Sequence, residues 1–427
     1  MSKIKLAIAD IDGVLRGKYI SIKKFNKLKE NNNVGFCSVI FGWDCDDECY
    51  DDIDFTGWHT GYHDIITHID FGTFRHITWE DDQPFYLLDY NNPICPRFLL
   101  KNIIKESESM GYIPTFALEY EWFNFKNNKG LNINNLIPIT EGNFGYTLLR
   151  LYENNEFVET LFKHLNNTYI PIECIHCESG PGVLEAALEY CDALEMADRS
   201  VIFKYAVKSI AKHYGYIATF MAKWNEQLPG SGGHIHQSLW DKNKMKNLFY
   251  NEKDSNGMSD IMKNYLAGQL YCLPFILPLY APTINSYKRL VDGYWAPTRV
   301  GWGIENRTTT HRVIKGGTGT RIECRVAGAD ANPYLVIAAS LASGLYGIKN
   351  KLKLDDNITG NAYINKTLKI LPKTLYESIE NMKKSEIPNI LFGKTFVSHF
   401  IKTREWECKK FNTCVSDWEL KRYFEII

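Results

Sequence analysis

The sequence predicts an α+β protein, and two observations lead to this fold class. Strand-like runs with alternating apolar and polar residues recur through roughly the first 340 residues, in an order that suggests antiparallel pairing. Long helical patterns are mixed with them and dominate from about residue 332 to the C-terminus. The chain has 427 residues, enough for two or three domains.

The N-terminal part carries short β-like runs that are separated by turn residues. They are KLAIADIDGV, GFCSVIFGW, RHITWE and PFYLLDY. Together they predict a small sheet domain over residues 1–96. The stretch NNPICPR at 91–97 is typical of a linker, so the second domain is expected over residues 97–427.

The second domain is expected to begin with a helix. RFLLKNIIKESESM places four aliphatic residues on one helical face and stops at Gly111. Four more elements follow in order: a strand over 113–125, a polar surface loop over 127–135, a long amphipathic helix over 193–214, and the strand YIATFMAK after Gly215.

The charge balance and the apolar pattern exclude several classes of protein. Lys and Arg number 49 against 50 Asp and Glu, so neither nucleic acid nor an anionic membrane is expected as a partner. The first residues do not have the pattern of a signal peptide. The apolar stretch LYCLPFILPLYAP, around residues 270–282, is too short to span a bilayer and is expected in the core.

The eleven cysteines show no framework spacing, which predicts reduced thiols in a cytoplasmic protein. Cys174 and Cys177 form a C-x-x-C around His176. No second Cys/His pair with zinc-finger spacing accompanies them, so both are expected to be buried strand thiols.

Two predicted strands carry charges on a shared face. In TFALEYEWF, Glu119 and Glu121 lie together, opposite a face of large apolar residues. Two adjacent carboxylates repel each other and need a compensating cation. TRIECRV repeats the pattern with Arg321, Glu323 and Arg325. Alone, each pattern would also suit a solvated strand face.

Two further segments add possible metal ligands. GSGGHIHQSL places His234, His236 and Ser238 on alternate residues, and CESGPGVLE places Glu178 and Glu185 around a Gly-Pro-Gly turn. A set of carboxylates with one or two imidazoles suits Mg²⁺ or Mn²⁺ better than structural zinc. Nearby arginines indicate phosphate chemistry, although neither a P-loop nor the kinase motifs are present.

These segments resemble the glutamine synthetase superfamily over nearly the full chain. The matching stretches, in family order, are DIDGVLRGK, ALEYEWF, ESGPGVLE, ATFMAK, GSGGHIHQSL, NSYKRLVDGYWAPT, ENRTTTHR, RIECR and GADANPYL. The resemblance implies an N-terminal β-grasp domain and a larger catalytic domain. It also implies ATP as co-substrate, glutamate as the acid, two Mg²⁺ or Mn²⁺ ions, and a homo-oligomer (a hexameric ring or a dodecamer) with active sites between subunits.

The resemblance further implies a role for individual residues. One metal ion would be held by Glu121, Glu178 and Glu185, and the other by Glu119, His234 and Glu323. The substrate would be bound by Gly230, Arg289, Arg325 and Trp295. The reacting phosphoryl group would be faced by Arg307, Arg312 and His236. ATP would be bound by Glu173, Ser238 and Arg312.

Three positions depart from the ammonia-using members of the family. Trp295 stands in DGYWAP where those members have the glutamate that binds and deprotonates ammonium. An indole accepts no proton from ammonium, but it can pack on an alkyl amine or hold a cation. Val183 stands where those members have a glutamine that approaches the substrate. The resemblance therefore implies the ligase chemistry more firmly than it implies glutamate as the acid. The acidic loop 44–54 stands where those members have Asp-Gly-Ser-Ser. Its aspartates could hold a protonated amine, or they could be merely solvated. The spacing of its residues does not fit a calcium loop.

The leading hypothesis is an ATP-dependent ligase that joins the γ-carboxyl group of glutamate to a primary amine through a γ-glutamyl phosphate. One alternative is a glutamine synthetase that uses ammonia. Another is a non-catalytic homologue with a structural or regulatory role. The identity of the amine and the choice between hexamer and dodecamer stay open at this point.

Overall fold

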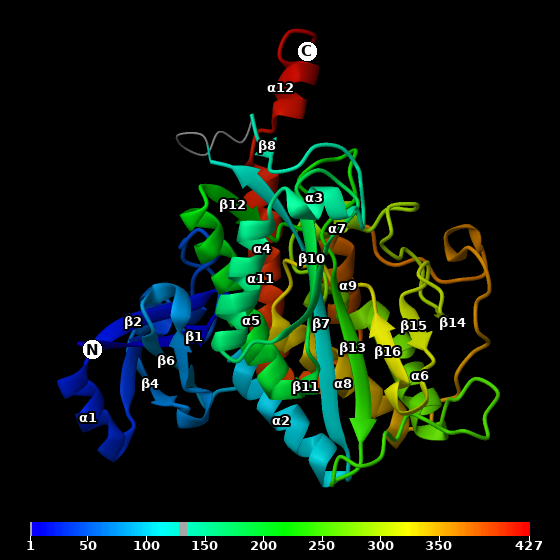
Figure 1. The fold of residues 1–427 in the computed structure, drawn as a ribbon, viewed down its shortest axis with the longest axis horizontal. Coiled ribbons are helices and arrows are strands. Elements are labelled where there is room, and N and C mark those ends of the chain that lie inside the picture. The colour runs from blue at the N-terminus through cyan, green and yellow to red at the C-terminus, as the bar shows by residue number, and fades with distance from the viewer. Residues whose placement is uncertain (1, 128–134) are drawn as a thin grey trace.

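The computed structural model describes residues 2–127 and 135–427, so most of the polar run at 127–135 lies outside the described residues. Two sheets organise the described chain (Figure 1). The smaller sheet has the order β2-β1-β6-β4-β3, with β5 on β6. Its strands are β1 (Lys3–Ala9), β2 (Leu15–Ser21), β3 (Val34–Cys37), β4 (Asp64–Ile69), β5 (Arg75–Ile77) and β6 (Gln83–Asp89).

The smaller sheet is mostly antiparallel, but β1 and β6 run parallel. Helix α1 (Ile22–Asn31) packs on it through Phe25 and Leu28. Two expected strands are shorter than predicted, because GFCSVIFGW and RHITWE turn into short 3₁₀ helices at Ser38 and Thr78.

The larger sheet is built around β7 (Ile113–Lys126), which pairs with β10 on one side and β13 on the other. The sheet order is β14-β15-β16-β13-β7-β10-β9, and β14 and β15 run parallel to each other. The other strands are β8 (Ile137–Pro138), β9 (Ile172–Cys177), β10 (Val183–Leu188), β11 (Cys191–Asp192), β12 (Tyr216–Thr219), β13 (Gly233–Trp240), β14 (Trp302–Ile304), β15 (His311–Ile314) and β16 (Arg321–Cys324).

Helices pack against one face of the larger sheet, and α12 projects away from the body at the C-terminal end (Figure 1). The helix α2 begins at Pro96, inside the predicted linker, because proline suits the first turn of a helix. The helices are α2 (Pro96–Ser109), α3 (Leu148–Tyr152), α4 (Asn155–Asn167), α5 (Ala193–His213), α6 (Asp260–Ile276), α7 (Ser286–Arg289), α8 (Pro333–Lys349), α9 (Leu375–Lys384), α10 (Ile387–Phe392), α11 (Lys394–Thr413) and α12 (Asp417–Tyr423).

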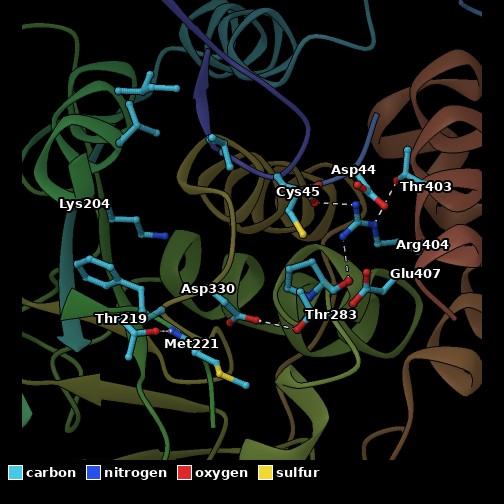
Figure 2. Close-up of a pocket in the computed structure, with 18 of the residues that line it drawn as sticks. Asp44, Cys45, Lys204, Thr219, Met221, Thr283, Asp330, Thr403, Arg404 and Glu407 are labelled. Carbon is cyan, nitrogen blue, oxygen red and sulfur yellow. Dashed lines mark hydrogen bonds and ion pairs between the residues drawn. The ribbon is translucent and has the colours of Figure 1, made fainter. Parts of the chain in front are cut away.

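The N-terminal part is tied to the C-terminal helix α11. Arg404 Nη2 donates to Asp12 Oδ1 at 2.6 Å, and Trp406 Nε1 donates to Asp44 Oδ2 at 2.8 Å. A cavity of 360 Å³ lies among the β1–β2 turn, α5 and α11 (Figure 2). Segments that are distant in the sequence therefore form its walls.

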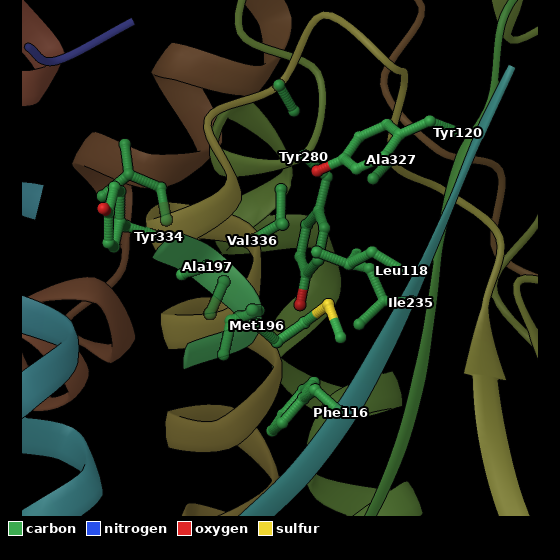
Figure 3. Close-up of a cluster of buried hydrophobic side chains, with 14 of the residues drawn as sticks. Phe116, Leu118, Tyr120, Met196, Ala197, Ile235, Tyr280, Ala327, Tyr334 and Val336 are labelled. Atoms are coloured by element: carbon green, nitrogen blue, oxygen red, sulfur yellow. The ribbon is translucent and has the colours of Figure 1, made fainter. Parts of the chain in front are cut away.

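The main core lies between β7 and the helices. Phe116, Leu118, Tyr120 and Trp122 are buried on one face of β7, and Phe116 and Leu118 are drawn near Met196 of α5 in Figure 3. Because side chains alternate along a strand, this packing places Glu119 and Glu121 on the opposite face.

The cysteines agree with the predictions except at one position. All eleven cysteines are free, and Cys177 is buried, but Cys174 is exposed. The prediction was wrong for Cys174 because an odd spacing along a strand puts the two thiols on opposite faces.

The apolar run near residue 275 is buried, as expected. Among the described residues, no helix has both the length and the hydropathy needed to cross a membrane.

A buried ion cluster joins α2, α5 and β6. Arg97 is 2% exposed; its guanidinium donates to Asp198 at 2.9 and 2.7 Å and also contacts Asp89. The Tyr334 hydroxyl of α8 donates to the same Asp198 carboxylate at 2.7 Å. Lys101, at the edge of the cluster, pairs with Asp89 at 2.5 Å. Arg97 therefore neutralises carboxylates that the fold has removed from water.

Replacing this guanidinium is expected to destabilise the fold. Arg97→Met leaves Asp198 buried without its cation, which typically costs about 3–5 kcal/mol in the free energy of unfolding. Urea unfolding followed by circular dichroism measures the change in midpoint. Lys101→Met is the matched control; it removes a half-exposed partner and should cost about 1 kcal/mol or less. Equal midpoint shifts in the two variants would contradict a special role for Arg97.

Candidate active site

Strand register gathers the predicted site on the sheet face that the core does not occupy. Alternation alone gives each strand a charged face, but the pairing decides which charges meet. The directly opposed residues are Glu119 with His234, Glu121 with Glu185, Glu323 with His236, Glu323 with Arg312, and Glu185 with His176.

The His234 imidazole lies among three carboxylates. Its Nδ1 is 3.5 Å from Glu119 Oε2 and 3.7 Å from Glu323 Oε1. Its Nε2 is 3.9 Å from Glu121 Oε1 and makes no hydrogen bond within the described residues, although it is buried. A buried ring nitrogen that faces carboxylates without a hydrogen bond suits a metal ligand.

Three groups of side chains bring potential ligand atoms within 4.8 Å of one another. They contain five of the six predicted metal ligands. Glu121 is outside these groups, and its Oε2 accepts a hydrogen bond from the Gly232 amide at 2.7 Å. The groups are Glu119, His236 and Glu323; Glu119, Glu185 and His234; and His176, Glu178 and Glu185.

The electrostatics of these groups are unbalanced without a cation. Burial, with repulsion from Glu121, Glu119 and Glu178, raises the pKa of Glu185 to about 10. Such a carboxyl ionises readily only beside added positive charge. Oxygen donors with an imidazole therefore fit a divalent ion such as Mg²⁺ or Mn²⁺.

Other carboxylates of the site already have cationic neighbours. Burial acts against ionisation of Glu119, but His236 and His234 outweigh it and hold its pKa well below the usual range. Burial likewise opposes ionisation of Glu323, yet Arg325 and the two histidines lower its pKa to about 2. Both groups are therefore permanent anions near neutral pH.

Glu323 also fixes two of the predicted arginines. Arg312 Nη1 donates to Glu323 Oε2 at 3.1 Å, and Arg325 Nη1 donates to Glu323 Oε1. The second terminal nitrogen of Arg325 lies 3.4 Å from the Trp295 carbonyl oxygen. One buried carboxylate thus sets the position of two guanidinium groups that are suited to bind anions.

Two cavities flank this charged face. The larger, 330 Å³, is lined by Glu173 and Ser238, which were predicted at the nucleotide, together with Glu119 and His236. The smaller, 20 Å³, is lined by the predicted substrate residues Gly230, Arg289 and Trp295 with Glu121, Glu178 and Val183. A space of that size holds about one water molecule, so a molecule as large as glutamate fits only if this side opens.

Close packing explains the glycine at position 230. A Cβ atom there would lie 2.2 Å from the Ala222 carbonyl oxygen and 2.8 Å from Arg289 Cγ. Arg289 itself is buried and donates to the carbonyl oxygens of Val326 at 2.9 Å and Arg325 at 3.2 Å. The loop can therefore pack this closely against the Arg289 side chain only because residue 230 has no side chain.

Trp295 and Arg307 are the most open of the predicted residues. Trp295 has a φ of 61°, which is unusual for a bulky residue, and is 58% exposed. Arg307 is exposed and lines neither cavity, although its charge acts on Tyr146 beside Glu178. Movement of either side chain is therefore little restricted by its neighbours.

Sequence reasoning missed some residues that line the larger cavity. Arg321 lines it and donates to His236 Nδ1 at 3.2 Å. The alternation of RIECR already placed Arg321 on the face of Glu323 and could have identified it. Tyr190 lines the same cavity with an exposed ring, and no spacing in the sequence indicated it.

The acidic loop 44–54 is mostly neutralised within its own chain. Lys402 Nζ lies 3.1 Å from Asp54, and the amines of Lys409 and Lys410 contact Asp51 and Glu48. Asp46 is exposed, and its carboxylate has no ion pair among the described residues. Few carboxylates of the loop are therefore free to hold a separate amine.

Comparison with known proteins identifies the family. The family model described as "Glutamine synthetase, catalytic domain" matches residues 93–423. Type-1 glutamine synthetase 2 of Dictyostelium discoideum is 50% identical, over 99% of this chain and 84% of the relative. Glutamate–isopropylamine ligase of a Pseudomonas species is 36% identical, over 99% of this chain and 95% of the relative.

A solved structure of GmaS in complex with ADP has the same fold. Its TM-score is 0.87 at 24% sequence identity, and the match covers 99% of this chain and 97% of that one. The mixed helix and strand architecture is therefore that of glutamine synthetase-type structures, with a large catalytic part. On the family model and these relatives, the chain belongs to the glutamine synthetase family.

Proposed function

We propose that this ATP-dependent carbon–nitrogen ligase joins the γ-carboxyl group of L-glutamate to a primary amine other than ammonia. The observation that carries the proposal is Trp295, an indole that lines the substrate cavity beside Glu121, Glu178 and Arg289. An indole offers an apolar face to an alkyl chain and no base to ammonium. The relative named for isopropylamine agrees with an organic amine.

In the first step of the proposed reaction, a γ-carboxylate oxygen of glutamate attacks the γ-phosphorus of ATP. A bond forms between the carboxylate oxygen and the γ-phosphorus. The bond between that phosphorus and the β–γ bridging oxygen breaks, and ADP leaves with this oxygen. Arg289, and Arg325 with it, would hold glutamate, while Arg312, Arg307 and His236 would stabilise the phosphoryl oxygens. Glu173 and Ser238, which line the larger cavity, would bind ATP there together with Arg312 from beside Glu323.

Bound divalent ions would neutralise phosphate charge and polarise the phosphoryl oxygens. The proposed holders are Glu121, Glu178 and Glu185 for one ion, and Glu119, His234 and Glu323 for the other. Five of these residues lie on β7, β10, β13 and β16, and Glu178 directly follows β9, which supports the proposal because the rigid sheet keeps their spacing.

In the second step, the nitrogen of the neutral amine attacks the carbonyl carbon of the acyl phosphate. The new carbon–nitrogen bond forms, inorganic phosphate leaves with the bonding electrons, and the nitrogen loses a proton. Because Trp295 accepts no proton, the amine must lose its proton to another acceptor. Ammonia remains the second candidate substrate, since the relative with 50% identity is named a glutamine synthetase.

We further propose a homo-oligomeric ring, as a hexamer or dodecamer, in the cytoplasm. The C-terminal segment supports assembly: Trp418, Phe424 and Ile426 are exposed on or beyond the projecting helix α12, which indicates a surface for a neighbour. The free thiols suit a reducing compartment. The two sheets support a boundary between residues 1–96 and 97–427.

Removing Glu323 is expected to abolish activity. Glu323→Ala deletes a proposed metal ligand and leaves Arg312 and Arg325 without their shared anion. ATP-dependent phosphate release measures activity, and circular dichroism should show a folded chain. Glu323→Gln, which keeps the shape without the charge, should be equally inactive. Turnover by either variant at saturating Mg²⁺ would contradict the metal assignment.

The indole is expected to select the amine. Burying methylene groups against Trp295 is worth about 0.8 kcal/mol each, so a short alkyl chain could gain roughly 2 kcal/mol, on the order of thirtyfold in kcat/KM. Trp295→Glu should lower kcat/KM for the preferred amine and raise it for ammonium. The comparison uses ammonium and a series of primary amines with both enzymes, and Trp295→Phe as an apolar control. Wild-type preference for ammonium at neutral pH would favour a glutamine synthetase.

Ring assembly is expected to place the acidic loop at a neighbour's site. A variant with Asp46→Ala and Asp47→Ala should therefore regain partial activity when it is mixed and reassembled with Glu323→Ala, because some sites then combine two intact halves. The readout is phosphate release after reassembly, with each variant alone as the control. Mixed oligomers that show no recovery would argue that one chain supplies the whole site.

A further inference from the structure

The cavity of 360 Å³ near the N-terminal sheet is separate from the proposed active site. Its walls come from the β1–β2 turn, the acidic loop, α5, the end of β12, the 329–330 segment and α11 (Figure 2). It contains none of the residues proposed to bind metal, glutamate or ATP. Its volume is within the range of about 300–1,000 Å³ that is typical of small-molecule sites.

One wall presents the amines of two lysines. Lys204 and Lys208 lie one turn apart on α5 and both line the cavity. Among the described residues, neither has a carboxylate within 4 Å, and Lys204 Nζ donates to the Ala331 carbonyl oxygen at 2.8 Å. Burial lowers the pKa of Lys204 to about 7. The charge of Lys208 acts in the same direction, and that of Asp330 opposes it. This wall would therefore be stabilised by an anion.

Four carboxyl groups line the rest of the cavity, and two of them, Asp12 and Asp44, accept hydrogen bonds from Arg404 and Trp406. Asp330 Oδ2 accepts hydrogen bonds from Ser286 and Thr283, but its Oδ1 is buried without a partner in the described chain. Glu407 has no ion pair among the described residues, and burial raises its pKa. Figure 2 shows Lys204 at the left, Glu407 at the right and Asp330 between them.

The nearby Arg404 forms no ion pair with Glu407 in the described chain, although its charge opposes the rise in the pKa of Glu407 that burial causes. Arg404 donates to Asp12 at 2.6 Å and to the Pro282 carbonyl oxygen at 3.0 Å. Its donors are thus directed to other groups of the wall. Within the described residues, Lys204, Lys208, Asp330 and Glu407 therefore form no ion pair, although Lys204 Nζ lies 4.9 Å over the Tyr120 ring.

We propose that this cavity binds the zwitterionic head group of a small α-amino acid. The carboxylate would contact Lys204 and Lys208, and the ammonium group would contact Asp330 and Glu407. A purely anionic molecule would leave the acids unpaired, and a purely cationic molecule would leave the lysines unpaired. A zwitterion satisfies both walls. This inference does not depend on the proposed amine ligase activity.

Isothermal titration of the full chain with L-alanine, without ATP or added metal, tests the proposal. Lys208→Met should weaken alanine binding at least about tenfold, because it removes one of the two ammonium groups. Lys212→Met is the matched control, since it makes the same change one turn further along α5 and outside the cavity. The control should bind as the wild type does, and thermal unfolding checks that both variants are folded.

Two further comparisons test the zwitterion. Propionate lacks the ammonium group and alaninamide lacks the carboxylate, so each should bind at least about tenfold more weakly than alanine. Glu407→Gln should weaken alanine binding as Lys208→Met does. Alanine binding that is unchanged in both variants would place it at the glutamate cavity and overturn the proposal. A wild-type chain that binds no alanine at millimolar concentrations, or binds propionate equally well, would also overturn it.

Discussion

Antiparallel pairing of β7 with β10 and β13 is the constraint on which the structure depends. The apolar face of β7 is buried against α5, so its register is held by the hydrophobic core. A slip of one residue would turn Glu119 and Glu121 into the apolar core and Trp122 onto the charged face. The energy that stabilises the core therefore also holds several carboxylates close together, against their mutual repulsion.

That repulsion is resolved differently on the two sides of the charged face. Arg312 and Arg325 compensate Glu323, and His236 compensates Glu119. On the β10 side, Glu185 faces other carboxylates and no adjacent arginine or lysine forms an ion pair with it in the described chain. The strongest local demand for a cation is therefore at Glu185. A divalent ion there would complete the electrostatics that the side chains leave unbalanced.

The proposed amine end of the site combines apolar and aromatic groups with the charged side chains of Glu121, Glu178 and Arg289. Trp295 and Val183 line the small cavity with Glu178. The acidic loop, which carries many negative charges, is neutralised largely by lysines of α11 in the same chain. In the proposed amine ligase, electrostatic capture of a protonated amine would therefore depend on few groups, and packing against the indole would contribute to the choice of amine.

The sequence by itself determined the alternation that puts Glu119 with Glu121 and Arg321 with Glu323, since strand geometry fixes which side chains share a face. It also determined the α+β class and the family, through motifs in order. Only the tertiary structure decided that His236 meets Glu119, that Tyr190 lines the larger cavity, and that Arg97 in the expected linker is buried beside Asp198. Those contacts join segments far apart in the chain, and their register and packing leave no periodic signal in the local sequence.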